Sequence, residues 1–265
     1  MATCINCERE VTDNFCAHCG QRTGVKRITF REGWNDFWAR VYGFDGMFPR
    51  TLKDLTLRPG QASRTFISGN RARYYGPVGY FFLMVSVLLL LISFLDIDYI
   101  DFIKNVSQSR FQEIKPGSGQ EKLSQIIMRF MSDNFRWVAF ALIPFQSFYA
   151  RFLFFRKSGL NYIEHTVLPF YLQGHTQWLG MINMIVYKVS GAFVNNFFVW
   201  IISTLFFCYA YANFIDYQPK WKSFLKGFGI FYVSLVTFVL LAIIALFLLF
   251  QMSPDFYELV KPSNN

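Results

Sequence analysis

The sequence predicts an all-α integral membrane protein with about five transmembrane helices, preceded by a small Cys4 zinc ribbon. Three observations support this fold class. Hydrophobic residues make up 53% of the 265 residues and charged residues only 16%, whereas soluble globular chains carry about 25% charged residues. Long apolar runs alternate with short charged loops from residue 76 onward. Four of the five cysteines lie within the first 24 residues.

Residues 1–24 are predicted to form the zinc ribbon. Two Cys-x-x-Cys pairs, separated by eight residues, supply four thiolates, which suit a tetrahedral zinc ion in a closed, structural site. The gap is too short to hold a hydrophobic core, so metal binding would supply the folding free energy. A rubredoxin-type iron site and a redox dithiol are the alternatives. The predicted metal ligands are Cys4, Cys7, Cys16 and Cys19.

The cysteines are expected to lie in the cytosol. The first apolar run begins only near Pro77, so no cleavable signal peptide is predicted. The first transmembrane helix would then act as the insertion signal and leave everything before it inside the cell. Because the cytosol is reducing, clustered cysteines there favour metal binding over disulfides.

Residues 25–75 are predicted to form a basic, aromatic connector. Trp34 and Trp38 fall on one broad apolar face of a helical pattern, opposite a polar face. A Trp-rich amphipathic helix beside a membrane domain is suited to lie among lipid headgroups. Packing of this face on the zinc ribbon or on the ends of the spans is an equally weighted alternative.

Three arginines near the end of the connector are candidates for headgroup or partner contact. Arg64, Arg71 and Arg73 precede the first span, and each cation near an anionic membrane surface contributes about 1 kcal/mol. Simple orientation charges are the equally weighted alternative.

Residues 76–265 are predicted to form the helical membrane domain. A span needs roughly 20 predominantly apolar residues. The last run is the most apolar, and the third is the weakest because it contains polar residues. The predicted spans cover about residues 77–95, 137–155, 166–186, 194–215 and 228–250, with an outer loop at 96–134.

The distribution of Lys and Arg indicates that the third run also crosses the membrane. Residues 1–75 hold twelve basic and seven acidic residues, whereas the outer loop holds five basic and six acidic residues. Without the third span, the basic cluster at Lys220–Lys226 would move outside, against the positive-inside rule. The sequence therefore predicts a protein of the cytoplasmic (inner) membrane, with its N-terminus in the cytosol and its C-terminus outside.

The third span contains the predicted intramembrane polar site. Gln173 and Gln177 are four residues apart and share a helical face, and His175 lies between them. Polar groups within a span often mark a pathway or a binding site. Hydrogen bonding between helices is the commoner explanation, because Gln and His are milder than a buried Asp or Lys.

The order of short motifs in the first third of the chain supports a family resemblance. CxxC and CxxCGQ are followed by Arg-Thr-Leu, Arg-Pro-Gly, Arg-x-Phe-Ile-x-Gly-x-Arg and Tyr-x-x-Pro. This order resembles an uncharacterised bacterial family of multi-pass membrane proteins with an N-terminal zinc ribbon, a domain of unknown function. The segment 58–77 is the more specific part, and beyond it the likeness is one of hydropathy. The resemblance implies a metal-binding role for the four cysteines and no catalytic role.

These features together predict a membrane-anchored scaffold or adaptor whose zinc ribbon and connector dock a partner protein at the cytoplasmic face. No metalloprotease motif, phosphate-binding glycine loop or Gly-x-Ser-x-Gly elbow is present, so an enzyme is not the leading interpretation. Nucleic acid is not an expected partner, because the basic segment leads straight to the bilayer.

Two other functions remain open at this point. One is a small transporter or permease with a polar route in the third span, which would need a homo-oligomer to enclose a path. The other is a lipid-modifying membrane enzyme that holds a headgroup with the arginine cluster.

Overall fold

The computed structural model describes residues 2–4, 7–19, 47–70, 73–97, 102, 119–192 and 194–252. The chain divides into two compact units, residues 1–46 and 47–265, which are described separately below. Trp34, Trp38 and Arg71 lie outside the described residues.

The N-terminal unit contains a two-stranded antiparallel sheet. Strand β1 (Ala2–Thr3) pairs with β2 (Glu10–Val11), with Ala2 opposite Val11. The hairpin places Cys4 directly after β1, and Val11 packs with Cys4 and Cys16 in a small buried cluster. A core of this size is too small to stabilise a fold by apolar burial alone.

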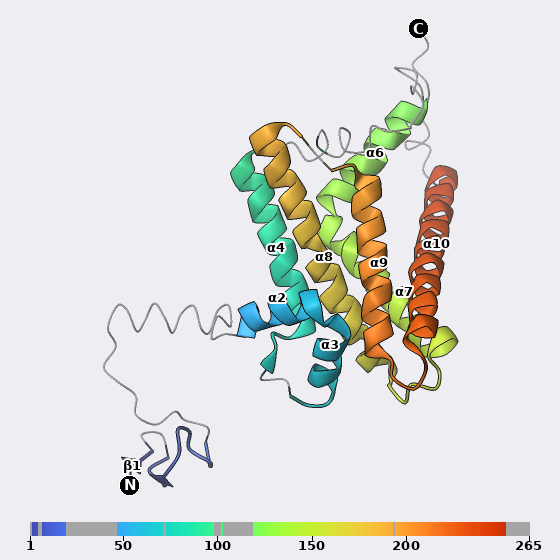
Figure 1. The fold of residues 1–265 in the computed structure, drawn as a ribbon. Coiled ribbons are helices and arrows are strands. Elements are labelled where there is room, and N and C mark those ends of the chain that lie inside the picture. The colour runs from blue at the N-terminus through green and yellow to red at the C-terminus, as the bar shows by residue number, and fades with distance from the viewer. Residues whose placement is uncertain are drawn as a thin grey trace. The chain divides into compact units, whose positions relative to one another are not determined.

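The second unit is a bundle of long helices that run side by side (Figure 1). Within the described residues, four helical stretches are long and apolar enough to cross a membrane: Pro77–Leu95, Trp137–Phe154, Phe197–Phe214 and Lys220–Leu248. The predicted fold class, an all-α membrane protein, is confirmed. The long helices are α4 (Pro77–Leu95), α7 (Phe135–Tyr149) with its π-helical continuation η2 (Ala150–Phe154), α8 (Tyr162–Ser190), α9 (Asn196–Phe214) and α10 (Lys220–Met252).

Helix α8 is the fifth long helix and contains the weakest predicted span. Its 29 residues extend about 43 Å, at about 1.5 Å per residue. It contacts α2, α3, α4, α7 and α9, and most of its residues from His165 to Gly174 are buried. A helix surrounded by protein does not need to be apolar on every side, because its polar groups find partners on its neighbours.

Local sequence signals fix where α4 and α8 begin and end. Proline occupies the first turn of α4, where its missing N–H removes no hydrogen bond. At the start of α8, Asn161 and Glu164 form a reciprocal capping box. Gly191 ends α8 in the left-handed conformation, with φ of 68°, which glycine adopts without steric cost.

Two short helices, α2 (Met47–Leu57) and α3 (Pro59–Ile67), cover one end of the bundle (Figure 1). Helix α3 contacts α8 and α9. A Cβ atom on Gly60 would lie 2.4 Å from the backbone of Asn213 and Phe214, so only glycine permits this approach. Helix α6 (Gly119–Asp133) lies toward the opposite end of the bundle and contacts α7.

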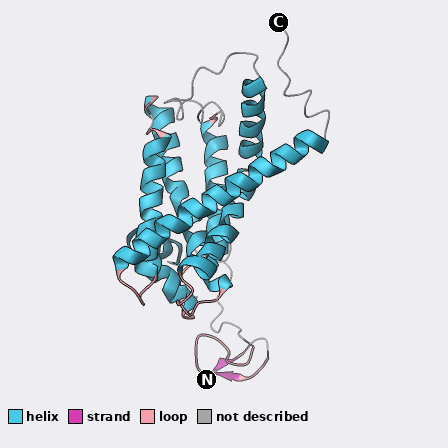
Figure 2. Cartoon of the chain, turned by 90° about the vertical axis from the view of Figure 1, so that its right-hand side faces the viewer, coloured by secondary structure: helices cyan, strands magenta, loops and turns pink. Residues whose placement is uncertain are grey.

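Helix α10 runs obliquely to its neighbours, and its slant is clear when the bundle is viewed from the α10 side (Figure 2). Its 33 residues exceed the roughly 20 that cross a bilayer perpendicularly, and tilting accommodates a longer helix. The residues from Val236 to Leu248 are largely exposed and apolar, as expected for a surface that faces lipid.

Candidate functional site

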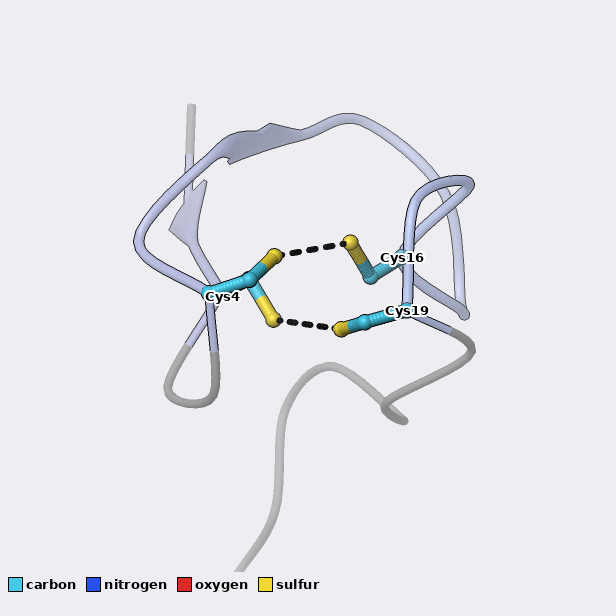
Figure 3. A group of neighbouring side chains, drawn as sticks. Cys4, Cys16 and Cys19 are labelled. Atoms are coloured by element: carbon cyan, nitrogen blue, oxygen red, sulfur yellow. Dashed lines mark hydrogen bonds between the residues drawn. The ribbon is translucent and has the colours of Figure 1, made fainter.

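The four predicted cysteine ligands come together in the N-terminal unit. The Sγ atoms of Cys4 and Cys19 are 3.5 Å apart, and those of Cys7 and Cys16 are 3.6 Å apart. All four sulfur atoms lie within 4.8 Å of one another. Figure 3 shows the side chains of Cys4, Cys16 and Cys19 turned toward a common centre. These four cysteines can therefore hold a metal ion.

The separations can be compared with the geometry of a tetrahedral zinc site. With Zn–S bonds of about 2.3 Å, the sulfur atoms of a regular tetrahedron lie about 3.8 Å apart. The observed closest pairs are slightly shorter, and all four cysteines are free of disulfides. The donor set therefore fits zinc and leaves no open coordination position.

Backbone groups around the second cysteine pair favour a thiolate. The backbone N–H groups of Cys19 and His18 donate toward Cys16 and hold the pKa of its thiol below the ordinary value. Hydrogen bonds to the charged form stabilise it. Metal ligation requires the deprotonated sulfur, so this arrangement prepares Cys16 as a ligand.

His175 lies in a hydrogen-bonded relay between three helices. Its Nδ1 is 2.9 Å from the hydroxyl oxygen of Tyr80 on α4, and its Nε2 is 3.1 Å from that of Thr56 on α2. Thr56 donates its one hydroxyl proton to the backbone carbonyl of Leu52. The Nε2–H of His175 therefore donates to Thr56, and in a neutral imidazole Nδ1 accepts from the Tyr80 hydroxyl. These two contacts select one tautomer of the neutral imidazole.

The relay lies toward the α2 end of the bundle. Tyr80 is the fourth residue of α4, about 5 Å along the axis from the start of that helix. His175 is thirteen residues beyond the start of α8, or about 20 Å along its axis. The first half of α8 therefore extends past the start of α4, into the layer that α2 and α3 cover.

The two predicted glutamines do not join this relay. The side-chain amide of Gln177 donates to the backbone carbonyl of Gln173, 3.1 Å away. The cavity beside His175 is lined by neither glutamine. The structure therefore brings Gln173 and Gln177 together but separates them from the partners of His175.

Of the three predicted headgroup arginines, two lie within the described residues. The Arg64 guanidinium pairs with the carboxylate of Asp216 in the loop between α9 and α10. The Arg73 guanidinium lies 5.6 Å from the ring centroid of Tyr74. Arg64 therefore has a protein partner, and Arg73 has an aromatic one.

Sequence reasoning missed a set of hydroxyl groups that fasten α2 to the bundle. The buried Thr51 hydroxyl donates to the carbonyl of Met47 and accepts from the backbone N–H of Tyr75. The Tyr74 hydroxyl donates to Asp54 at 2.8 Å, and the Tyr171 hydroxyl donates to the Tyr75 carbonyl at 2.6 Å. The sequence signal that could have indicated these hydrogen bonds is the clustering of Thr and Tyr around the segment from Arg-Pro-Gly to Tyr-x-x-Pro.

Comparison with known proteins adds one match. Residues 45–89 match the family described as "Protein of unknown function (DUF3667)". This segment comprises α2, α3 and most of α4, including Thr51, Thr56, Tyr75 and Tyr80. No curated protein and no solved structure matches the chain. The match therefore covers the elements that fasten the α2 end of the bundle, and it assigns no activity.

Proposed function

We propose that the protein is a membrane-anchored adaptor whose N-terminal zinc ribbon docks a partner protein. The observation that carries this proposal is the convergence of four cysteine sulfurs without a fifth ligand position. A closed thiolate shell stabilises a fold and provides no site for a reacting water. A small metal-stabilised unit attached to a membrane bundle is suited to recognition rather than to catalysis.

The ribbon offers an apolar contact point next to one of its ligands. Phe15 precedes Cys16, and its side chain is 59% exposed. Aromatic side chains are enriched at protein interfaces, where they bury a large area at low entropic cost. We assign Phe15 to the docking surface because it is aromatic and exposed. Its substitution by alanine leaves all four cysteines in place, so it tests docking without removing a metal ligand.

We further propose that the α2 and α3 end of the bundle faces the cytosol. Arg156 and Lys157 lie in the loop between η2 and α8, and Lys220 and Lys222 lie in the first turn of α10. An excess of Lys and Arg in short loops is typical of the cytoplasmic side. The ribbon precedes α2 in the chain, so this orientation supports a cytosolic docking module in a bacterial inner membrane.

Cross-linking in intact cells, followed by purification and mass spectrometry, tests the adaptor proposal. Phe15→Ala and Cys4→Ser should each lose the same partner protein. Cys208→Ser should retain it, because Cys208 is buried in α9 and is not one of the four clustered cysteines. A partner set that is identical in the wild type, Phe15→Ala and Cys4→Ser contradicts the proposal.

A further inference from the structure

A cavity of about 400 Å³ lies between α2, α8 and α9. This volume falls within the range of about 300–1,000 Å³ that is typical of small-molecule sites. Its apolar walls are formed by side chains from all three helices: Leu52, Trp178, Leu179, Ile182, Ile202 and Phe206. Two members of the relay described above, His175 and Thr56, form its polar end together with Thr176.

The rim of the cavity is apolar and exposed on the surface of the bundle. Ile182 on α8 is 54% exposed, and Ile202 on α9 is 49% exposed, although both line the cavity. Ile202 belongs to the stretch Phe197–Phe214, one of those apolar enough to span a membrane. A lipid chain can therefore reach the cavity laterally without leaving the apolar phase.

The polar end of the cavity does not favour the binding of a charged ligand. The described residues that line the cavity include no Asp, Glu, Lys or Arg. The protons of Tyr80, His175 and Thr56 are each already donated within the relay. Thr176 donates to the carbonyl of Gln173. The indole N–H of Trp178 also lines the cavity and is buried without a hydrogen-bond partner in the part of the chain that the structure describes. This single neutral donor would not compensate a charged headgroup for its lost hydration, which is costly.

We propose that this cavity binds one hydrocarbon chain of a membrane lipid, which enters laterally between Ile182 and Ile202. The chain lies along α8 from Ile182 toward His175, a distance of about 10 Å along the helix axis. Its headgroup stays outside the cavity. Burial of the chain brings together α2 and two membrane helices, so lipid occupancy stabilises the docking of α2 on the bundle.

Photolabelling of the full-length chain in vesicles tests this site. The vesicles consist of phosphatidylcholine with a minor share of phosphatidylcholine that carries a diazirine on one acyl chain. After irradiation, mass spectrometry gives the ratio of adducts on the cavity residues 178–182 and 202–206 to adducts on the lipid-facing residues 236–248 of α10. In the wild type, labelling of the cavity should saturate as the probe share rises, whereas labelling of α10 should rise in proportion.

A bulky side chain in the cavity should exclude the lipid chain. Leu179→Trp should lower the adduct ratio by about tenfold. The matched control is Leu90→Trp on α4, where Leu90 is 69% exposed, and its ratio should equal that of the wild type. If Leu179→Trp does not insert into the membrane, Ile202→Trp fills the cavity from the opposite wall.

Two results would overturn the proposal. One is an adduct ratio that is the same in the wild type and in both cavity-filling variants. The other is cross-linking of the cavity residues to a second protein chain in place of lipid.

Discussion

The Arg64 guanidinium on α3 faces both carboxylate oxygens of Asp216, which lies 152 residues further along the chain in the loop between α9 and α10. This pair joins the segment that matches a known family to the last two membrane helices. Bidentate geometry makes the interaction directional. Both side chains remain partly exposed, at 40% and 68%, so solvent screening reduces its contribution.

We expect a coupling free energy of about 0.5 kcal/mol between Arg64 and Asp216, the size typical of exposed ion pairs. A double-mutant cycle with Arg64→Ala and Asp216→Ala, measured by thermal unfolding in detergent, gives this value. Arg50→Ala, at an exposed arginine on α2, is the charge-matched control and should show no coupling to Asp216→Ala. Additive effects of the two alanine substitutions would show that the pair contributes nothing.

The same pair predicts a pH dependence at the acidic end. The hydrogen bond and charge of Arg64 lower the pKa of Asp216 below its ordinary value of 3.8. A carboxyl group with a depressed folded-state pKa stabilises the fold above its unfolded-state pKa, and this stability is lost as the pH falls through the folded-state pKa. The stability difference between the wild type and Arg64→Ala should therefore be constant from neutral pH to about pH 5 and shrink below about pH 4. A difference that grows on acidification would contradict the pairing.

The membrane fold was predictable because its signal is local. A run of apolar residues such as Val85–Ile92 identifies a span without knowledge of its neighbours. The cysteine cluster was also predictable, because the Cys-x-x-Cys spacing itself brings two thiols to one turn. The third span gave a weaker signal because α8 contains polar side chains. His175 bonds to residues on two other helices, and Gln177 bonds to the backbone of α8 itself.

The contacts of the α2 end could not be predicted, because each joins residues that are distant in the sequence. His175 was singled out by its chemistry, but its partners Tyr80 and Thr56 lie 95 and 119 residues away. Nothing in the pattern of the third span distinguishes His175, which lines a cavity, from Gln177, which bonds to its own helix. Only the packing of α2 against α4, α8 and α9 separates these roles.

Metal removal should unfold the N-terminal unit and leave the bundle helical. We expect one zinc ion per wild-type chain by elemental analysis, none in Cys4→Ser, and one in Cys208→Ser. Apparent zinc-binding free energies in small ribbons are about 10–16 kcal/mol, which far exceeds what the buried cluster of Val11, Cys4 and Cys16 could supply. A chelator should therefore make the segment from Cys7 to Cys19 sensitive to protease without a loss of helical circular dichroism. Metal retained in Cys4→Ser would point to a site elsewhere.

The buried hydroxyl of Tyr171 should matter more than the exposed hydroxyl of Tyr209. Tyr171→Phe removes the donor to the Tyr75 carbonyl at 2.6 Å, and Tyr209→Phe removes the donor to the Leu57 carbonyl at 2.9 Å. Tyr171 is fully buried, so the loss of its hydroxyl leaves the half-buried Tyr75 carbonyl without this donor, with an expected cost of about 1–3 kcal/mol. Water can replace the Tyr209 hydroxyl, so that variant should lose less than about 0.5 kcal/mol. Thermal unfolding in detergent compares the two, and equal losses would contradict the argument.

Gly60 and Gly180 provide a matched pair of helical glycines in opposite environments. A Cβ at Gly60 would lie 2.4 Å from the backbone of Asn213 and Phe214 and 2.7 Å from the carbonyl oxygen of Ala210. Because these are backbone atoms of α9, they cannot rotate aside, and Gly60→Ala should destabilise the protein by about 1–3 kcal/mol.

A Cβ at Gly180 would meet nothing within 4 Å. Gly180→Ala should therefore stabilise α8 by up to about 1 kcal/mol, because alanine loses less backbone entropy in a helix. The two variants change the same atoms, so opposite shifts of the unfolding temperature isolate the contact between α3 and α9. A gain of stability in Gly60→Ala would show that α3 does not lie against the backbone of α9. The segment 45–89, which matches the family, would then not be held to α9 through this contact.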